Sequence, residues 1–256
     1  MRSCRAAMLL MLSTPLLSPL TCLADEAPPV TPYRPSVSSP AQLPAPGQLE
    51  LELGGLAVRD HGARRDSLPY AFKLGFNPEW GVVVSGEAYV SQRDAGMPRD
   101  SGIGDTAFTL KRAWAAGEGE AYGLEVMARA PTAKSAIGSG KADYGLNAIC
   151  SRDFGSVHMD ANLNATRIGA RGVSEGRVQT GLSASFSAPV NDKWGATLEW
   201  SGTRRSGVAS TAQLLAAAAY SPHPRLTLDV GVARGLNHAT PQWALFTGMV
   251  LPIANF

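Results

Sequence analysis

The sequence predicts an all-β protein, an antiparallel up-and-down transmembrane β-barrel of about twelve strands in the outer membrane of a Gram-negative bacterium. Three observations predict this fold. Apolar and polar residues alternate with period two from residue 47 to the C-terminus. The mean hydropathy, −0.04, is close to zero because lipid-facing and lumen-facing residues cancel. Beyond residue 24, the chain has no apolar run long enough for a membrane-spanning helix.

Residues 1–24 have the pattern of a secretory signal peptide. Arg2 and Arg5 precede an apolar stretch over residues 6–20, and small residues lead to an expected cleavage site after Ala24. The stretch is too short and too interrupted to cross a bilayer as a helix. A lipoprotein acylated at Cys22 is the alternative, which the three preceding residues disfavour. We therefore expect export to the outer membrane.

Removal of the signal peptide changes the charge and cysteine content. The whole chain has 23 basic and 21 acidic residues, and the signal carries two of the arginines and no acid, so the remainder is balanced. This balance gives no indication of a nucleic-acid partner. Cys150 would remain as the single cysteine, so we expect neither an internal disulfide nor a cysteine-based metal site.

Residues 25–46 are rich in proline, with seven prolines in the segment. Such a composition cannot pack a core and is typical of an extended or disordered lead-in. The barrel domain is then expected over residues 47–256.

Twelve alternating segments are the expected strands of this domain. The clearest alternation places Val157, Met159 and Ala161 against His158 and Asp160. The segment 211–220 is ambiguous because its alanines also suit a helix, and its neighbours favour a strand. The expected strands lie near 49–53, 70–76, 82–90, 105–111, 122–129, 146–151, 157–166, 178–187, 194–200, 211–220, 226–232 and 243–256.

The links between these strands alternate in length. Short turns on the periplasmic side and longer loops outside are typical of such barrels, which would place both chain ends in the periplasm. The short links lie near 77–79, 115–121, 152–155, 190–193 and 222–225. The longer links lie near 57–69, 91–104, 131–143, 169–177, 201–210 and 235–242.

Aromatic residues support the membrane assignment. Trp and Tyr residues fall at expected strand ends, where a girdle would lie, although tryptophans begin strands in many β-proteins. The terminal Phe256 suits recognition by the barrel-assembly machinery, whereas Pro252 should lie at an edge or bulge because it lacks a ladder donor. The girdle residues are Trp80, Tyr122, Trp194, Tyr220 and Trp243.

The polar face of the strands predicts the lining of the pore, and it has more acids than bases. Two interpretations remain open: the charges pair into a network that nearly closes the lumen, or the acidic excess leaves a narrow channel that prefers cations. The expected pore-lining residues are Glu50, Glu52, Lys73, Glu87, Asp105, Lys111, Glu125, Arg129, His158, Asp160, Asn162, Asn164, Glu199 and Asp229.

The outer loops carry an excess of cations. These could hold phosphates of anionic lipopolysaccharide, or they could simply be solvated. The residues concerned are Arg59, Arg64, Arg65, Arg93, Arg99, Lys134, Lys141, Arg171, Arg204 and Arg205.

Motifs for chemistry are weak. The stretch Gly138–Lys141 lacks the first glycine and the Ser/Thr of a phosphate loop, and the four histidines have no metal-ligand spacing. His158 and Asp160 could belong to a hydrolase site, as in outer-membrane phospholipase, but that enzyme's site faces the lipid. We expect no catalytic residues, cofactor or metal.

Several segments of the chain resemble a known family. They are Ser-Gly-Ile-Gly-Asp-Thr at 101–106, the block 126–133 with its Pro-Thr-Ala, the Asp-Tyr-Gly-Leu at 143–146 and the hairpin 149–164. Together they resemble outer-membrane proteins of the MetA-pathway-of-phenol-degradation or transporter-like family. The resemblance implies a medium-sized barrel in the outer membrane and gives no catalytic residues to carry over to this chain.

The resulting hypothesis is an outer-membrane channel for small molecules, including apolar or aromatic compounds, which diffuse passively through a narrow, acid-rich lumen. Its expected partners are membrane lipid, lipopolysaccharide, the assembly machinery and the solute. A membrane-embedded lipid or ester hydrolase and a closed structural barrel are the alternatives.

Overall fold

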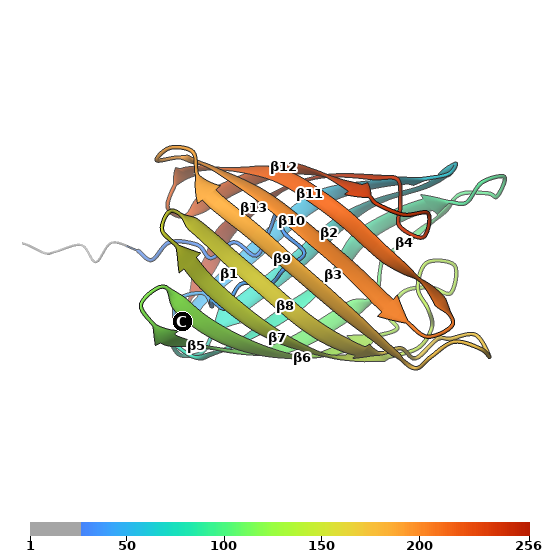
Figure 1. Ribbon diagram of the computed structural model, residues 1–256, viewed down its shortest axis with the longest axis horizontal. Helices are drawn as coiled ribbons and strands as arrows, with labels where there is room; N and C mark the ends of the chain where they lie inside the picture. The colour runs from blue at the N-terminus through green and yellow to red at the C-terminus, as the bar shows by residue number, and fades with distance from the viewer. Residues whose placement is uncertain (1–26) are drawn as a thin grey trace, which may run out of the picture.

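The computed structural model describes residues 27–256, so the expected signal peptide lies outside the described residues. The strands run obliquely around a barrel whose two ends differ in loop length (Figure 1). They are β1 (Gln48–Asp60), β2 (Ala63–Gly75), β3 (Trp80–Arg93), β4 (Asp100–Gly102), β5 (Thr106–Gly117), β6 (Glu120–Ala130), β7 (Asp143–Phe154), β8 (Val157–Arg167), β9 (Val178–Pro189), β10 (Trp194–Arg205), β11 (Val208–His223), β12 (Leu226–Gly235) and β13 (Trp243–Asn255).

The barrel is closed because β1 pairs antiparallel with both β2 and β13. The short β4 and the longer β5 pair with different parts of β3, so together they occupy one strand position. Every other strand pairs with its neighbours in chain order. The predicted up-and-down barrel of twelve strand positions is confirmed. None of the described residues form a helix long and apolar enough to cross a bilayer.

The ambiguous segment 211–220 is a strand, as predicted. It forms the middle of β11, which pairs with β10 on one side and β12 on the other. Backbone pairing on both sides outweighs the helix preference of its alanines, which is a weak bias that tertiary context readily overrides.

Two of the predicted long links were wrong. β1 and β2 are joined by the two-residue turn His61-Gly62, in which both residues have positive φ, as a tight hairpin turn requires. β10 and β11 are also joined by two residues, Ser206-Gly207, of which Gly207 has positive φ. Most residues of 57–69 and 201–210 therefore belong to strands. Many of them are polar because these strand ends extend beyond the apolar band of the barrel wall. The other longer links lie where expected.

Two bulges change the simple alternation. The register of β1 and β13 shifts between Leu49 and Glu50, whose partners are Ala254 and Pro252. The bulge therefore lies beside Pro252, the proline that was expected at an edge or bulge. The register of β2 and β3 shifts so that Ala88 is the extra residue. Alternation with Val82 and Val84 predicts that Val90 faces the lipid and Tyr89 faces the lumen. Beyond this second bulge the reverse holds, because Tyr89 is 47% exposed and Val90 is fully buried. A single inserted residue moves every following side chain to the other face.

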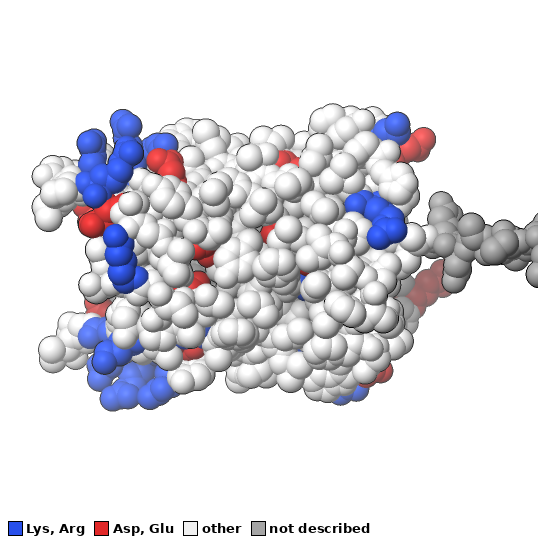
Figure 2. All heavy atoms as spheres, turned by 180° about the vertical axis from the view of Figure 1, so that it is seen from behind, with Lys and Arg blue, Asp and Glu red and all other residues white. Residues whose placement is uncertain are grey.

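The outer wall is apolar and the interior is polar. Leu198, Leu245 and Val230 are among the large side chains left more than half exposed on the wall, whereas Lys73 and Lys111 are fully buried. Figure 2 shows a wall of mainly uncharged residues, with most of the visible Lys and Arg at one end of the barrel. This inversion relative to a soluble protein is that of a transmembrane barrel.

The expected girdle is divided between the two ends of the barrel. The ring of Trp194 packs on that of Tyr220 with centroids 4.7 Å apart, and Trp114 and Tyr122 lie 6.3 Å apart, at the end that holds the short turns. Trp243 begins β13 at the end with the longer loops.

Candidate functional site

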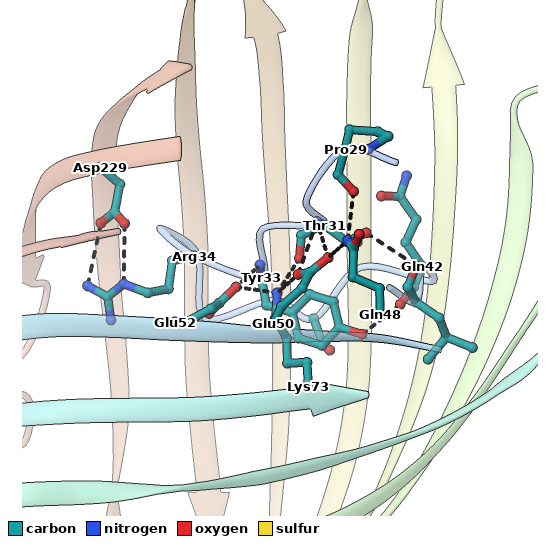
Figure 3. A network of polar contacts seen from close by, with 12 residues as sticks. Pro29, Thr31, Tyr33, Arg34, Gln42, Gln48, Glu50, Glu52, Lys73 and Asp229 are labelled. Atoms are coloured by element: carbon teal, nitrogen blue, oxygen red, sulfur yellow. Dashed lines mark hydrogen bonds and ion pairs between the residues drawn. The ribbon is translucent and has the colours of Figure 1, made fainter. Parts of the chain in front are cut away.

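Residues 27–46, here called the lumen segment, lie inside the barrel. The segment enters from the end that also holds the C-terminus (Figure 1) and its residues reach the inner wall (Figure 3). Gly47, with φ of 80°, then turns the chain into β1, and a Cβ at this position would clash with the carbonyl oxygen of Phe256. Residues 27–45 of the expected lead-in form no helix or strand, and the barrel wall supplies hydrogen-bond partners to them.

The segment can occupy the lumen because of its composition. Proline lacks an N–H group, so a proline-rich chain has few backbone donors to satisfy. The remaining donors must find acceptors when they are buried. The acids of the inner wall provide several of them.

One end of the segment is held by β1. The backbone N–H of Thr31 donates to Glu50 Oε1 at 3.0 Å, and that of Tyr33 donates to Glu52 Oε1 at 2.6 Å. Gln48 also donates to the carbonyl of Pro29 at 3.0 Å. Residues with the same parity on one strand thus hold every second residue of the segment.

A buried lysine joins the two carboxylates. Lys73 Nζ on β2 lies 2.9 Å from Glu50 Oε2 and 2.7 Å from Glu52 Oε1, and it also donates to the Thr31 carbonyl. Glu50 and Lys73 are register partners, so the pairing follows from the sheet itself. Removing charges from water is costly unless they are paired and hydrogen-bonded, and this cluster satisfies both conditions.

Tyr33 lies between two lysines. The Nζ atoms of Lys73 and Lys111 lie 4.3 and 3.9 Å from its ring centroid. Lys111 in turn pairs with Glu125 at 3.1 Å. The Tyr33 hydroxyl donates to the Gln42 carbonyl at 2.8 Å, which ties the two arms of the segment together. Desolvated cation–π contacts of this kind are among the stronger ones.

Arg34 reaches the opposite side of the β1–β13 seam. Its guanidinium lies 3.4 Å from the Asp229 carboxylate on β12 and donates to the Thr247 carbonyl at 3.1 Å. Gly54 and Gly248 make room for it, because a Cβ at either position would lie under 3.0 Å from an Arg34 atom. Small residues in facing strands therefore create the pocket that the arginine fills.

The later part of the segment is held by β10, with one acid. Val37 and Ser38 donate their backbone N–H groups to Glu199 Oε2 at 2.8 and 2.9 Å. The Ser38 hydroxyl donates to Ser183 Oγ at 2.9 Å. These contacts fix the segment across the lumen from β1.

Residues 39–41 complete the attachment through β6, β7 and β8. Ser39 donates its N–H to Asn162 Oδ1 at 2.7 Å and its hydroxyl to Glu125 at 2.5 Å. Ala41 donates its N–H to Ser151 Oγ at 2.7 Å. Most acceptors here are neutral amide and hydroxyl groups.

The other predicted residues lie apart from the segment. At the loop end Arg65 pairs with Glu87, Arg129 pairs with Asp143, and Asp105 accepts the N–H of Ala133 at 3.0 Å. The predicted residues that touch the segment are Glu50, Glu52, Lys73, Lys111, Glu125, Asn162, Glu199 and Asp229. Asn164 lies close to Gly181, where a Cβ would meet its amide.

The hydrolase alternative rests on the cluster around His158. Its Nε2 lies 3.2 Å from Asp160 Oδ1 and its Nδ1 lies 2.6 Å from Asp153 Oδ1. Ser151 donates to the same Asp160 oxygen and not to the histidine. A serine nucleophile needs a base that accepts its proton, and the described residues provide no Ser–His hydrogen bond in this cluster. The geometry is that of a hydrogen-bonded carboxylate.

Sequence reasoning missed the lumen segment itself and several of its small polar partners. The available signal was the acidic excess of the predicted lumen. Buried carboxylates need donors, and the barrel strands offered too few cations. The missed residues are Tyr33, Arg34, Ser38, Ser39, Gln48, Ser151 and Ser183.

Two spaces remain between the segment and the wall. One of about 320 Å³ is lined by residues that include Arg34, His158 and Ser185, and one of about 210 Å³ by residues that include Ser201 and Gln213. Both linings are rich in hydroxyl groups. No cluster of three or more His, Cys, Asp or Glu side chains suited to a metal ion occurs within residues 27–256.

The sequence pattern of one family runs through nearly the whole barrel. The family described as putative MetA-pathway of phenol degradation matches residues 34–252, from the lumen segment to the last strand. The chain belongs to this family. The family's match therefore includes most of the lumen segment as well as the barrel, and no curated protein matches the chain.

Solved structures share the fold. The COG4313 outer membrane channel from Pseudomonas putida F1 is similar over 88% of this chain and 100% of that chain, with a TM-score of 0.65 and 14% identity. The NanC porin is similar over 79% and 100%, with a TM-score of 0.57 and 9% identity. The KdgM porin, solved with disordered oligogalacturonate, is similar over 80% and 99%, with a TM-score of 0.54 and 8% identity. The barrel of this chain thus has the same fold as these outer-membrane channels and porins.

Proposed function

We propose that the protein is an outer-membrane channel for small molecules and that the lumen segment closes it in the state described here. The observation that carries this proposal is the set of contacts between the segment and eight residues expected to line the pore. A structural barrel could fill its interior with its own side chains. A separate chain segment, held by polar contacts, can instead be displaced.

The acidic lumen then has a different role from that of a cation filter. Glu50, Glu52 and Glu199 accept N–H groups of the segment, and Asp229 pairs with Arg34. The acids are therefore the docking site of the segment while the channel is closed. They would line the pore only when the segment moves.

The proposed solutes are small molecules that carry hydroxyl or similar polar groups, a class that includes phenols. The serine-rich linings beside the segment support this choice, since hydroxyl groups can both donate and accept hydrogen bonds. The description of the family agrees with it.

Planar-bilayer recordings test the proposal. The full chain should conduct little, and the double variant Tyr33→Ala/Arg34→Ala should raise the mean conductance several-fold, because it removes the cation–π contacts and the Asp229 pair. Val37→Ala is the matched control, since it alters an exposed side chain of the same segment and keeps its backbone contacts. Absence of conductance and of solute uptake into liposomes in both variants would favour the closed structural barrel.

A further inference from the structure

Four arginines and one tryptophan lie in register across five neighbouring strands at the loop end. Arg234 on β12 pairs with Trp243 on β13, which pairs with Arg59 on β1. Arg59 pairs with Arg64 on β2, and Arg64 pairs with Arg93 on β3. These five residues are called the arginine row. It follows the edge of the barrel without interruption.

The row faces outward. Trp243 alternates with Leu245, which is 59% exposed, and Arg64 has the same parity as the exposed Leu68. On β3 the bulge turns Tyr89 outward, and Arg93 shares its side of the strand. The row therefore lies at the upper border of the apolar wall, where a bilayer presents its headgroups.

Two cations of the row are free. Arg59 donates to Asp66 at 2.7 Å, and the Arg234 guanidinium lies 4.4 Å from the ring centroid of Trp243. Arg64 and Arg93 are exposed, and their side chains make no ion pair or hydrogen bond within residues 27–256. Like charges that face each other across strands destabilise a sheet. An external anion would relieve this repulsion.

A hollow in the outer wall begins directly beside the row. It has a volume of about 620 Å³ and lies between Leu68 and Tyr89 on one side and Leu245 on the other. Its floor consists of the small residues Gly55 and Ala57 of β1. The space above Gly55 is open, since a Cβ built there would contact only a Thr247 methyl group, at 3.7 Å. The hollow is apolar and continuous with the row, since Asp66 lines it and pairs with Arg59.

We propose that the arginine row and the hollow bind lipid A, the anchor of lipopolysaccharide. Its phosphate would lie on Arg64 and Arg93, because guanidinium groups form bidentate, charge-assisted hydrogen bonds with phosphate. One acyl chain would fill the hollow. The loop end faces the outer leaflet because the short turns and the C-terminus lie at the other end. The proposal does not depend on movement of the lumen segment.

Native mass spectrometry of the full chain in detergent, with purified bisphosphorylated lipid A as the probe, tests the proposal. Arg64→Gln/Arg93→Gln should weaken binding by at least roughly tenfold, because it removes both free phosphate ligands. The matched control Lys141→Gln/Arg171→Gln removes the same charge from exposed loops at the same end, and its affinity should stay within twofold, roughly, of the wild type.

A second variant tests the acyl part of the site. Ala57→Phe fills the hollow and leaves the arginines in place, so it should weaken lipid A binding while the heat-modifiable band on SDS gels shows a folded barrel. Equal losses in the paired and control variants would overturn the proposal. So would phosphatidylglycerol binding as tightly as lipid A, since it would indicate a general attraction to anionic lipid.

Discussion

On one side of the lumen, β1, β2 and β12 hold residues 31–34 with a cluster of paired charges. On the other side, hydroxyl and amide groups of β7, β8 and β9, together with the separate acids Glu199 and Glu125, hold residues 37–41. The charged side is almost fully buried, with Lys73 and Glu50 both at 0% exposure. Buried charges depend on one another, so loss of one partner leaves the others uncompensated. Neutral hydrogen bonds can be lost one at a time. The charged side should therefore determine whether the segment stays docked, and the neutral side should adjust its position.

The largest expected effect follows from removing the shared cation of the charged side. Lys73→Met would leave Glu50 and Glu52 buried without a counter-charge, which should lower the free energy of unfolding by about 3–5 kcal/mol. Urea unfolding of the barrel in lipid vesicles would measure it. Lys193→Met, in an exposed turn, is the control and should leave stability unchanged. Equal stability of Lys73→Met and Lys193→Met would contradict the prediction, because it would show that Glu50 and Glu52 do not need the charge of Lys73.

A smaller effect is expected when the segment loses its own cation. Arg34→Met should raise hydrogen exchange of the backbone N–H groups of Thr31, Tyr33 and residue 34 by roughly tenfold, because Asp229 loses its partner and the local opening free energy falls. The barrel strands should exchange as before. If exchange of residues 31–34 stays unchanged, the backbone bonds to Glu50 and Glu52 hold this end alone.

The smallest effect is expected on the neutral side. Ser183→Ala removes the acceptor of the Ser38 hydroxyl, which is one neutral hydrogen bond, and should cost about 1 kcal/mol of local stability. Exchange of residues 37–41 would measure it. Ser36→Ala is the matched control, because its hydroxyl contacts only the Ser38 carbonyl within the segment. A larger loss for Ser183→Ala than for Arg34→Met would reverse the proposed ranking of the two sides.

Much of the barrel could be predicted from the sequence because each strand carries a period-two pattern that records its two environments. The pattern also identified the residues that bind the segment, such as Glu52 and Glu199. It failed where a single residue changes the parity, as at Ala88, and where polar strand ends extend beyond the membrane, as at Asp60. Neither the bulge nor the polar strand ends change the local residue composition enough to be recognised from a short stretch of sequence.

The location of the lumen segment could not be predicted because it has no periodicity. Its prolines are compatible with disorder and with an extended chain in a polar cavity alike. The difference is made by partners far away in sequence, such as Asp229 for Arg34 and Ser183 for Ser38. Such long-range pairing leaves no local signal.

A disulfide between the segment and the wall tests the central claim most directly. Ser38 Oγ and Ser183 Oγ are 2.9 Å apart in the closed barrel, so Ser38→Cys/Ser183→Cys, made in a Cys150→Ser background, should form a disulfide in native outer membranes. The oxidised protein should show no openings in planar bilayers, whereas the reduced protein should show the low conductance expected of the wild type. A Ser38→Cys/Ser221→Cys pair should not form one. Absence of the first disulfide in folded protein, or equal formation of both, would contradict a lumen segment docked at this position.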